Sequence, residues 1–307
     1  MSKAGAEDCI LLGGEPTLHP RLLEIIDCVK HFQMRAIIVS NGRRFASREF
    51  AMAVSEHGVD AVNVSIHGWD TLTYKRLTGS SNGFRQVKQG ITNLIECGVN
   101  LGTTFVLTRH VTHCLDDVVS AIAGMGVRFV EFNMGAPAVS EAKIDGDHVI
   151  PLHQQKDVVL QALHLCKDMG ISVGFNLTIP HCLFSPSELK ELMNNSRISS
   201  GCSMRNGSGI VFKPDGSITT CNHFLDFEAI DKEKSSALLR NGQLLHYWNS
   251  EDMNALREEV NCYHAEACIS CQHWEACGGG CPINWMHFDP EEAGLKCMDI
   301  STLGDTL

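Results

Sequence analysis

The residues best suited to chemistry in this chain are cysteines near its C-terminal end. Four follow the spacing C-x2-C-x5-C-x3-C within ACISCQHWEACGGGCP and a fifth closes the array: Cys268, Cys271, Cys277, Cys281 and Cys297. Upstream, thirteen residues separate Cys202 from Gly216, and four more separate Gly216 from Cys221. Thiolates at such spacing on glycine-rich loops can converge on a soft metal centre. Seven cysteines in this sequence pattern are too many for one tetrahedral metal and suit two clusters.

Zinc is the alternative occupant, because C-x2-C pairs also occur in zinc ribbons and fingers. Zinc sites usually combine two C-x2-C pairs, or two cysteines with two histidines. Here the spacings are x2, x5 and x3, with further cysteines before and after the run. Iron–sulfur clusters accept varied short spacings. The pattern therefore favours clusters, and a zinc-stabilised binding module is the alternative.

The composition limits the class of protein. The chain has 307 residues, of which 44% are hydrophobic and 20% charged, as in soluble globular proteins. It has no signal peptide pattern and no apolar run of membrane-spanning length, so we expect a cytoplasmic location without a membrane partner. A formal net charge of −11 argues against nucleic-acid binding. Without a secretion signal, the 14 cysteines indicate metal or redox chemistry rather than disulfides.

The elements expected to position these groups alternate along the first 180 residues. Apolar runs predict strands at 9–12, 36–40, 61–66, 101–107, 127–132 and 171–177, and helical patterns cover 21–32 and 84–98. This alternation predicts an α/β fold with a parallel sheet covered on both faces, closing into a barrel or part-barrel. A hairpin is expected over 209–221. Cysteines at 9, 28, 97, 114 and 166 lie among apolar residues and are interpreted as inert core thiols.

Polar residues follow several of the predicted strands. Strand 9–12 leads into Gly13, Gly14 and Glu15, and the next strands lead into VSNG, VSIHG and VLTRH. Ligands of parallel sheets bind at the carboxyl ends of strands. Glu15 is therefore either a carboxylate for an ammonium group or a solvated residue of a tight turn. Ser40, Asn41 and Ser65 either line one shared ligand-binding opening at the strand ends or are turn residues.

Together these motifs resemble a known family. GGEP, SNG and SIHG after successive strands resemble the radical S-adenosylmethionine (SAM) enzymes, and the cysteine pattern resembles their SPASM-type C-terminal extension. The resemblance covers nearly the whole chain. It implies an incomplete parallel (β/α)6-type barrel over 1–180, which lacks the first βα unit. It also implies a small cysteine-rich iron–sulfur domain over 181–307.

The resemblance implies two auxiliary [4Fe–4S] clusters and bound SAM. Auxiliary cluster I would be held by Cys202, Cys221 and Cys281, with Cys182 as the candidate fourth ligand, and auxiliary cluster II by Cys268, Cys271, Cys277 and Cys297. SAM contacts are implied for Gly13, Gly14, Glu15, Ser40, Asn41 and Ser65. Where relatives often have a SAM-contacting arginine, this chain has Thr78, with Arg76 two residues earlier.

The chain departs from the family pattern at its front. The C-x3-C-x2-C loop that binds the SAM-cleaving cluster precedes GGEP in the family, but only Cys9 precedes Gly13 here. A third [4Fe–4S] cluster is therefore expected only if a missing N-terminal segment supplies its ligands. A truncated product, one half of a split protein and a natural remnant are the explanations, and truncation is favoured.

The implied function is that of a peptide- or protein-modifying maturase in the intact form. In the family an electron reduces the SAM-bound cluster, and SAM cleavage yields a 5′-deoxyadenosyl radical that abstracts a substrate hydrogen. A flavodoxin or ferredoxin is the implied electron donor. No sequence feature selects a catalytic acid or base. Because the SAM-cluster loop is missing, a non-enzymatic iron–sulfur electron carrier is the first alternative.

Overall fold

The structure is a computed structural model that describes residues 5–139, 144–176, 179–199, 202–224 and 226–288. These residues fall into two compact units. Unit 1 comprises 1–107, 111–133 and 161–175, and unit 2 comprises 108–110, 134–160 and 176–307. The chain thus changes unit at 175/176, near the domain boundary expected at 180, while 134–160 group with the later residues.

One sheet organises the first half of the chain. Its order is β1-β2-β3-β4-β5-β8-β9. The strands are β1 (Asp8–Leu11), β2 (Arg35–Ser40), β3 (Ala61–Ile66), β4 (Leu101–Leu107), β5 (Phe129–Met134), β8 (Ser172–Asn176) and β9 (Arg197–Ser199). The strands β1 to β4 pair in parallel with their neighbours. The α/β class and the six predicted strands are confirmed, with ends that differ by at most two residues.

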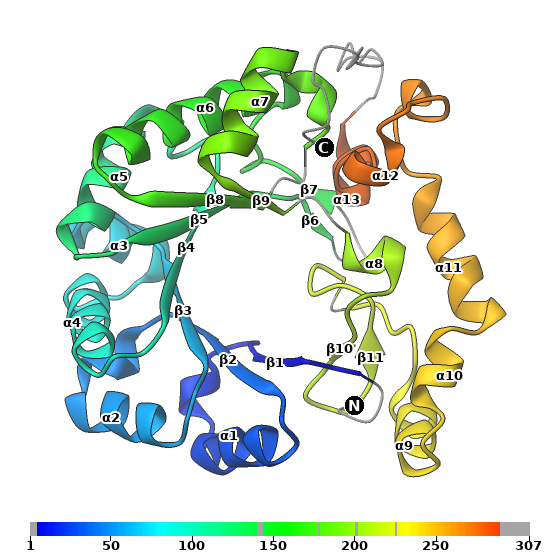
Figure 1. The fold of residues 1–307 in the computed structure, drawn as a ribbon, viewed down its shortest axis with the longest axis horizontal. Coiled ribbons are helices and arrows are strands. Elements are labelled where there is room, and N and C mark those ends of the chain that lie inside the picture. The colour runs from blue at the N-terminus through cyan, green and yellow to red at the C-terminus, as the bar shows by residue number, and fades with distance from the viewer. Residues whose placement is uncertain (1–4, 140–143, 177–178, 200–201, 225, 289–307) are drawn as a thin grey trace. The chain divides into compact units, whose positions relative to one another are not determined.

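Helices connect the strands and lie against one face of the sheet. They are α1 (Leu22–His31), α2 (Arg48–Glu56), α3 (Thr71–Thr78), α4 (Gly83–Glu96), α5 (Leu115–Gly124) and α6 (Leu152–Asp168). Figure 1 shows α1, α2, α4 and α5 along that face of β1 to β5. In β2, β3 and β5, buried residues alternate with half-buried ones. In these strands one set of alternating side chains is therefore more completely buried than the other.

The strand β1 is less buried than its apolar sequence predicts. Ile10 and Leu12 are 52% and 47% exposed, because β1 has a hydrogen-bonded neighbour on one side only, at the edge of the described sheet. Cys28 on α1 is also exposed, which corrects its assignment to the core. Cys166 on α6 is fully buried as expected, and burial raises the pKa of its thiol to about 12.

Unit 2 consists of short elements. Its helices are α7 (Pro186–Asn195), α8 (Ser203–Asn206), α9 (Lys232–Arg240), α10 (Leu244–Trp248), α11 (Glu251–Asn261), α12 (Trp274–Cys277) and α13 (Pro282–His287). It also contains two two-stranded sheets. One pairs β6 (Ala138–Val139) with β7 (Ile144–Asp145), and the other pairs β10 (Val211–Phe212) with β11 (Ile218–Thr219). The β10–β11 pair is antiparallel, which confirms the predicted hairpin. Its turn contains Gly216 at a φ of 93°. Within the described ranges, no helix is both long and apolar enough to span a membrane.

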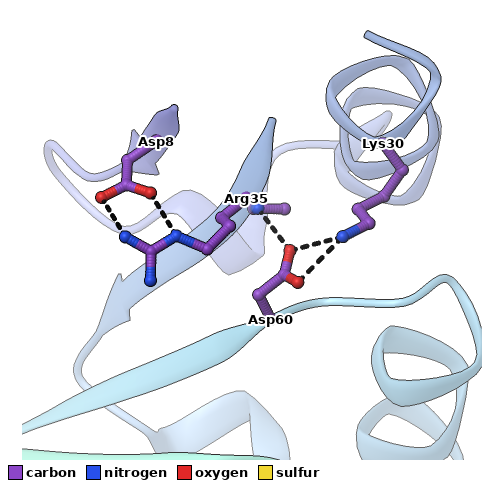
Figure 2. A network of polar contacts seen from close by, with 5 residues as sticks. Asp8, Lys30, Arg35 and Asp60 are labelled. Atoms are coloured by element: carbon purple, nitrogen blue, oxygen red, sulfur yellow. Dashed lines mark hydrogen bonds and ion pairs between the residues drawn. The ribbon is translucent and has the colours of Figure 1, made fainter. Parts of the chain in front are cut away.

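Ion pairs fix the beginnings of the first three strands (Figure 2). The Asp60 carboxylate, just before β3, accepts hydrogen bonds from Lys30 Nζ of α1 at 2.7 and 2.9 Å and from the Ala36 N–H of β2 at 2.7 Å. Arg35 pairs with Asp8 across β2 and β1. Partial burial alone would raise the pKa of Asp60, but the hydrogen bonds from Lys30 and Ala36 lower it.

We predict that Asp60→Ala lowers the free energy of unfolding by about 1–3 kcal/mol, because it leaves the Ala36 N–H and the Lys30 ammonium without their acceptor. The more exposed pair is the control, and Asp8→Ala should cost less than about 1 kcal/mol. Chemical denaturation of the whole chain measures the free energy of unfolding of both variants. Equal losses of free energy in the two variants would contradict the larger role of Asp60. Since the folded-state pKa of Asp60 is lowered, its contribution is present above about pH 3.9 and is lost as the pH falls through the folded-state pKa.

Candidate functional site

A fixed carboxylate lies at the carboxyl ends of β1 and β2. Glu15 Oε1 accepts hydrogen bonds from Thr17 N at 3.1 Å, Thr17 Oγ1 at 2.7 Å and Ser40 Oγ at 2.8 Å. Glu15 Oε2 accepts one from the Asn41 N–H at 2.8 Å. A carboxylate offers about four lone-pair sites. The half-buried Glu15 therefore has a defined orientation and keeps capacity on Oε2 for a further donor.

The residues beside this carboxylate leave space for a ligand. Gly13 has a φ of 100°, and a Cβ atom at Gly13 or Gly14 would meet nothing within 4 Å. His67 follows β3, and burial lowers the pKa of its imidazole despite the nearby Glu15 charge. Ser65 lies on β3, where its hydroxyl accepts a hydrogen bond from Thr104 Oγ1 at 3.4 Å. The structure thus joins Glu15, Ser40 and Asn41 directly, whereas the described contact of Ser65 is with β4.

In unit 2, four cysteines line one pocket. We call Cys182, Cys268, Cys271 and Cys277 the first thiol group. Cys182 lies in a 3-10 helix over His181–Leu183, and the other three lie on and around α12. Backbone N–H groups point at two of the sulfurs: His181 N donates to Cys277 Sγ at 3.3 Å and His273 N donates to Cys271 Sγ at 3.5 Å. Such hydrogen bonds favour the thiolate form and tune bound clusters.

Three further cysteines form the second thiol group: Cys202, Cys221 and Cys281. Burial raises the pKa of Cys281 to about 11, and the neighbouring thiols of Cys202 and Cys221 contribute to that rise. Burial also raises the pKa of Cys221, which has Cys202 as its thiol neighbour and accepts a hydrogen bond from His223 N at 3.5 Å. Buried thiols with raised pKa values are neutral near pH 7 unless a cation replaces their protons.

The grouping departs from the sequence-based assignment at one position. The sequence pattern associated Cys182 with Cys202, Cys221 and Cys281. In the structure, burial and then the thiols of Cys277, Cys268 and Cys271 raise the pKa of Cys182 to about 12. Cys182 also lines the same pocket as Cys268, Cys271 and Cys277, which is why it is counted in the first thiol group. Cys297, the predicted partner of that group, lies outside the described residues.

A run of three glycines lies between Cys277 of the first thiol group and Cys281 of the second. Gly278, Gly279 and Gly280 all have positive φ values, of 57°, 69° and 83°. A Cβ atom at Gly279 would lie 3.2 Å from Cys268 Sγ and 3.3 Å from the Trp274 ring. The left-handed turn and the close approach both require glycine. This turn allows Cys277 and Cys281, only four residues apart, to serve different groups.

A half-buried arginine lies near both groups and was not predicted from the sequence. Arg205 of α8 donates from Nη1 to Gly280 O at 3.2 Å and from Nη2 to Tyr263 O at 2.8 Å, and its guanidinium lies over the Trp274 ring. Burial lowers the pKa of Arg205, while Cys202, Cys281, Cys268 and Cys277 oppose that change. A cation at this position stabilises an anionic centre. Its only sequence signal is that it lies three residues after Cys202.

The donor sets fit iron–sulfur clusters chemically. They offer buried thiols, N–H groups directed at sulfur and a nearby cation. Proteins use these features to hold such clusters and to set their reduction potentials. Among the described residues, no three or more His, Cys, Asp or Glu side chains are arranged to hold a single metal ion. In a cubane cluster each thiolate binds a different iron, so its ligands need not meet at one point.

The N-terminal part of the chain is similar to known proteins. Residues 1–123 match the Radical SAM superfamily. Similar curated proteins include a probable GTP 3′,8-cyclase from Thermococcus kodakarensis, which is 35% identical over 95 residues, or 31% of this chain and 30% of that protein. A probable GTP 3′,8-cyclase from Methanococcus maripaludis is 28% identical over 155 residues, or 49% of this chain and 50% of that protein. The chain thus spans about a third to a half of the length of the curated relatives it matches.

Solved structures show the same fold over nearly the whole chain. One is anSMEcpe with bound AdoMet, which has a TM-score of 0.65 and 16% identity and is matched over 97% of this chain and 81% of that one. Another is Streptococcus suis SuiB bound to the precursor peptide SuiA, with a TM-score of 0.64, 16% identity, and 92% and 63% coverage. The fold is therefore that of an incomplete radical SAM barrel followed by a cysteine-rich region.

We predict that Gly279→Ala disrupts the first thiol group, because the added Cβ meets Cys268 Sγ and the left-handed φ is strained. Gly242→Ala is the matched control, since Gly242 also has a φ of 69° but a Cβ there would meet nothing within 4 Å. Iron and acid-labile sulfide per chain, measured after anaerobic purification, should fall by about half for Gly279→Ala and stay at the wild-type level for Gly242→Ala. Equal metal content in both variants would contradict this role of Gly279.

We predict that Arg205→Gln lowers the reduction potential of a bound cluster. A unit charge within about 10 Å at an effective dielectric constant of about 20 contributes about 1.7 kcal/mol, or roughly 70 mV for a one-electron couple. Arg257→Gln is the control, because the Arg257 guanidinium also lies over a tryptophan ring, that of Trp248, and no thiol affects its pKa. A redox titration followed by electron paramagnetic resonance measures both variants. An unchanged potential in Arg205→Gln would refute the electrostatic role.

Proposed function

We propose that this chain carries the SAM-binding sheet and a two-cluster iron–sulfur region of a radical SAM enzyme that modifies a peptide or protein. The observation that carries the proposal is the division of the cysteines in unit 2 into two thiol groups. Each group contains at least three buried or half-buried thiols, and those of the first group line one pocket. Together with Cys297, they supply ligands for two [4Fe–4S] clusters and form a SPASM-type region.

In this proposal the Glu15 carboxylate binds the SAM ammonium group. Thr17, Ser40 and Asn41 hold the carboxylate in place and leave lone pairs on Oε2. A charge-assisted hydrogen bond to a pre-oriented carboxylate is among the stronger polar contacts. Gly13 and Gly14 leave the adjacent backbone open to the ligand. Ser65 is proposed as a further polar contact from β3.

A reduced [4Fe–4S] cluster with SAM supplies the radical that abstracts a substrate hydrogen, and the protein positions and shields the reactants. The 307 residues contain no C-x3-C-x2-C run, so we propose that a segment outside this sequence supplies the ligands of that cluster. A flavodoxin or ferredoxin is the proposed electron donor. The two thiol groups would then hold clusters that accept an electron or anchor the substrate.

The substrate class rests on the similarity that extends furthest along the chain. Structures matched over more than nine tenths of this chain include anSMEcpe with a Kp18Cys peptide and SuiB bound to the precursor peptide SuiA. The probable GTP 3′,8-cyclases match half of the chain or less. A peptide or protein is therefore the proposed substrate. GTP is the second candidate, because those cyclases are the sequence relatives of the chain.

Two experiments test the proposal. Iron, zinc and acid-labile sulfide are measured on anaerobically purified protein, and two clusters predict about eight irons and eight sulfides per chain. One or two zinc ions without sulfide would instead favour the zinc-stabilised binding module. The DNA immediately upstream of Met1 is then read for an in-frame C-x3-C-x2-C segment and for a nearby gene encoding a short precursor peptide.

SAM cleavage distinguishes the enzyme from an electron carrier. With a strong reductant, the 307-residue chain should form little 5′-deoxyadenosine, and the chain extended by a C-x3-C-x2-C segment should form it readily. In the extended chain, SAM cleavage should increase when the precursor peptide is added rather than when GTP is added. Glu15→Gln should weaken SAM binding about tenfold or more. Glu24→Gln is the matched control, because Glu24 is an exposed glutamate paired with Arg21. Stimulation by GTP alone would overturn the peptide assignment.

A further inference from the structure

The strand β5 carries two polar side chains that the proposed SAM site does not use. Its residues alternate between half-buried and buried, and Glu131 and Asn133 are two of the half-buried ones. Side chains two positions apart on a strand lie on the same face of the sheet. Glu131 and Asn133 therefore share one face of β5, opposite to the face of Phe132, which is fully buried.

Contacts between neighbouring strands identify this face. The rings of Phe105 on β4 and Phe132 on β5 pack edge to face with centroids 6.3 Å apart, and both side chains are buried. The residues that precede them, Thr104 and Glu131, therefore lie on the opposite face. Thr104 pairs in register with Ser65 of β3, and its Oγ1 donates to the Ser65 hydroxyl at 3.4 Å. Glu131 thus shares a face of the sheet with Ser65.

The separation between Glu131 and the proposed SAM contact Ser65 suits a substrate position. Neighbouring strands lie about 4.8 Å apart, so β5 lies about 10 Å from β3. The group that a SAM-derived radical attacks must be held close to the bound SAM. A side chain two strands away on the same face can contact a molecule that is held there. Both residues belong to unit 1.

The polar atoms of this pair lack partners within the described part of the chain. Burial raises the pKa of the Glu131 carboxyl, and no hydrogen bond or charged group is among the causes. The Oδ1 atom of Asn133 is buried and has no hydrogen-bond partner there. A polar group that is removed from water without a partner costs free energy, and the cost is larger for a charge. Two such acceptors on one face favour a ligand that donates hydrogen bonds.

A cation is the ligand that offsets the cost at Glu131 most fully. A hydrogen bond between a charged donor and a carboxylate is shorter than one between neutral groups and about twice as strong. The chain contains 25 Lys and Arg residues against 36 Asp and Glu residues, and this negative balance attracts a cationic substrate. The charge of the chain and the position of Glu131 therefore favour the same kind of ligand.

We propose that Glu131 recognises a lysine or arginine side chain of the peptide or protein substrate, on the face of the sheet that carries Ser65. The inference rests on the proposed function and adds a requirement on the substrate, which is a positive charge near the residue that is modified. Asn133 supplies a second acceptor for the same segment of the substrate. No covalent bond changes in this step, so Glu131 determines specificity.

The test uses four pools of acetylated and amidated dodecapeptides, applied to the whole chain after anaerobic purification and immobilisation. The sixth position is arginine, citrulline, lysine or norleucine, and the other positions are random over uncharged residues. Citrulline and norleucine have nearly the shapes of arginine and lysine without the charge. Wild-type protein should retain the arginine and lysine pools about fivefold more than the matched uncharged pools.

Substitutions assign this preference to one carboxylate. Glu131→Gln should reduce the retention ratio to about one, and Glu131→Asp, which keeps the carboxylate, should preserve part of the preference. Glu188→Gln is the matched control, because Glu188 is also half-buried and the substitution removes the same charge. The Glu188 carboxylate already accepts hydrogen bonds from Lys156 Nζ and the Ser185 N–H, so this variant should keep the wild-type ratio. Circular dichroism checks that each variant is folded.

Three retention results would overturn the inference. They are equal retention of the charged and uncharged pools by the wild type, an unchanged ratio in Glu131→Gln, and an equal loss in Glu188→Gln, which would show general charge attraction. Weaker SAM binding by Glu131→Gln in equilibrium dialysis would also overturn it, because Glu131 would then contact SAM. Wild-type protein that binds no SAM and contains no sulfide would refute the proposed function, while the retention ratios still decide the role of Glu131.

Discussion

Several ionisable thiols share a small buried volume in unit 2, and they cannot all ionise there without a cation. Burial and neighbouring thiols raise the pKa of Cys182 to about 12 and that of Cys281 to about 11, so without metal both are neutral near pH 7. The apolar cores of this unit are small. Metal binding would therefore contribute directly to the folding free energy of the region. Arg205 lies near thiols of both groups.

The Glu15 site in unit 1 follows a different physical rule. Its carboxylate is fixed by hydrogen bonds from Thr17, Ser40 and Asn41 that the parallel register of β1 and β2 brings together. The ion pairs of Asp60 and Asp8 hold the opposite ends of these strands (Figure 2). A charged group held in place before the ligand arrives loses little entropy on binding. The sheet can therefore present a ligand-ready carboxylate without burying it completely.

The sequence predicted the strands well because β-branched apolar runs are local signals, as at 61–66. It predicted too much burial for β1, since an apolar run does not reveal whether a neighbouring strand is present on each side. Spacing identified the cysteines as a ligand array but could not group Cys182, because that placement depends on tertiary contacts of His181 and Leu183. Arg205 was missed for the same reason: its role depends on Gly280, Tyr263 and Trp274, which lie far along the chain.

The most direct test of the account is anomalous X-ray diffraction from anaerobically grown crystals, recorded at the iron and zinc absorption edges. The account predicts two separate iron sites of cluster size. One should lie beside Cys268, Cys271 and Cys277, and the other beside Cys202, Cys221 and Cys281. Single-ion peaks at the zinc edge, or one iron site bound by cysteines of both groups, would contradict it.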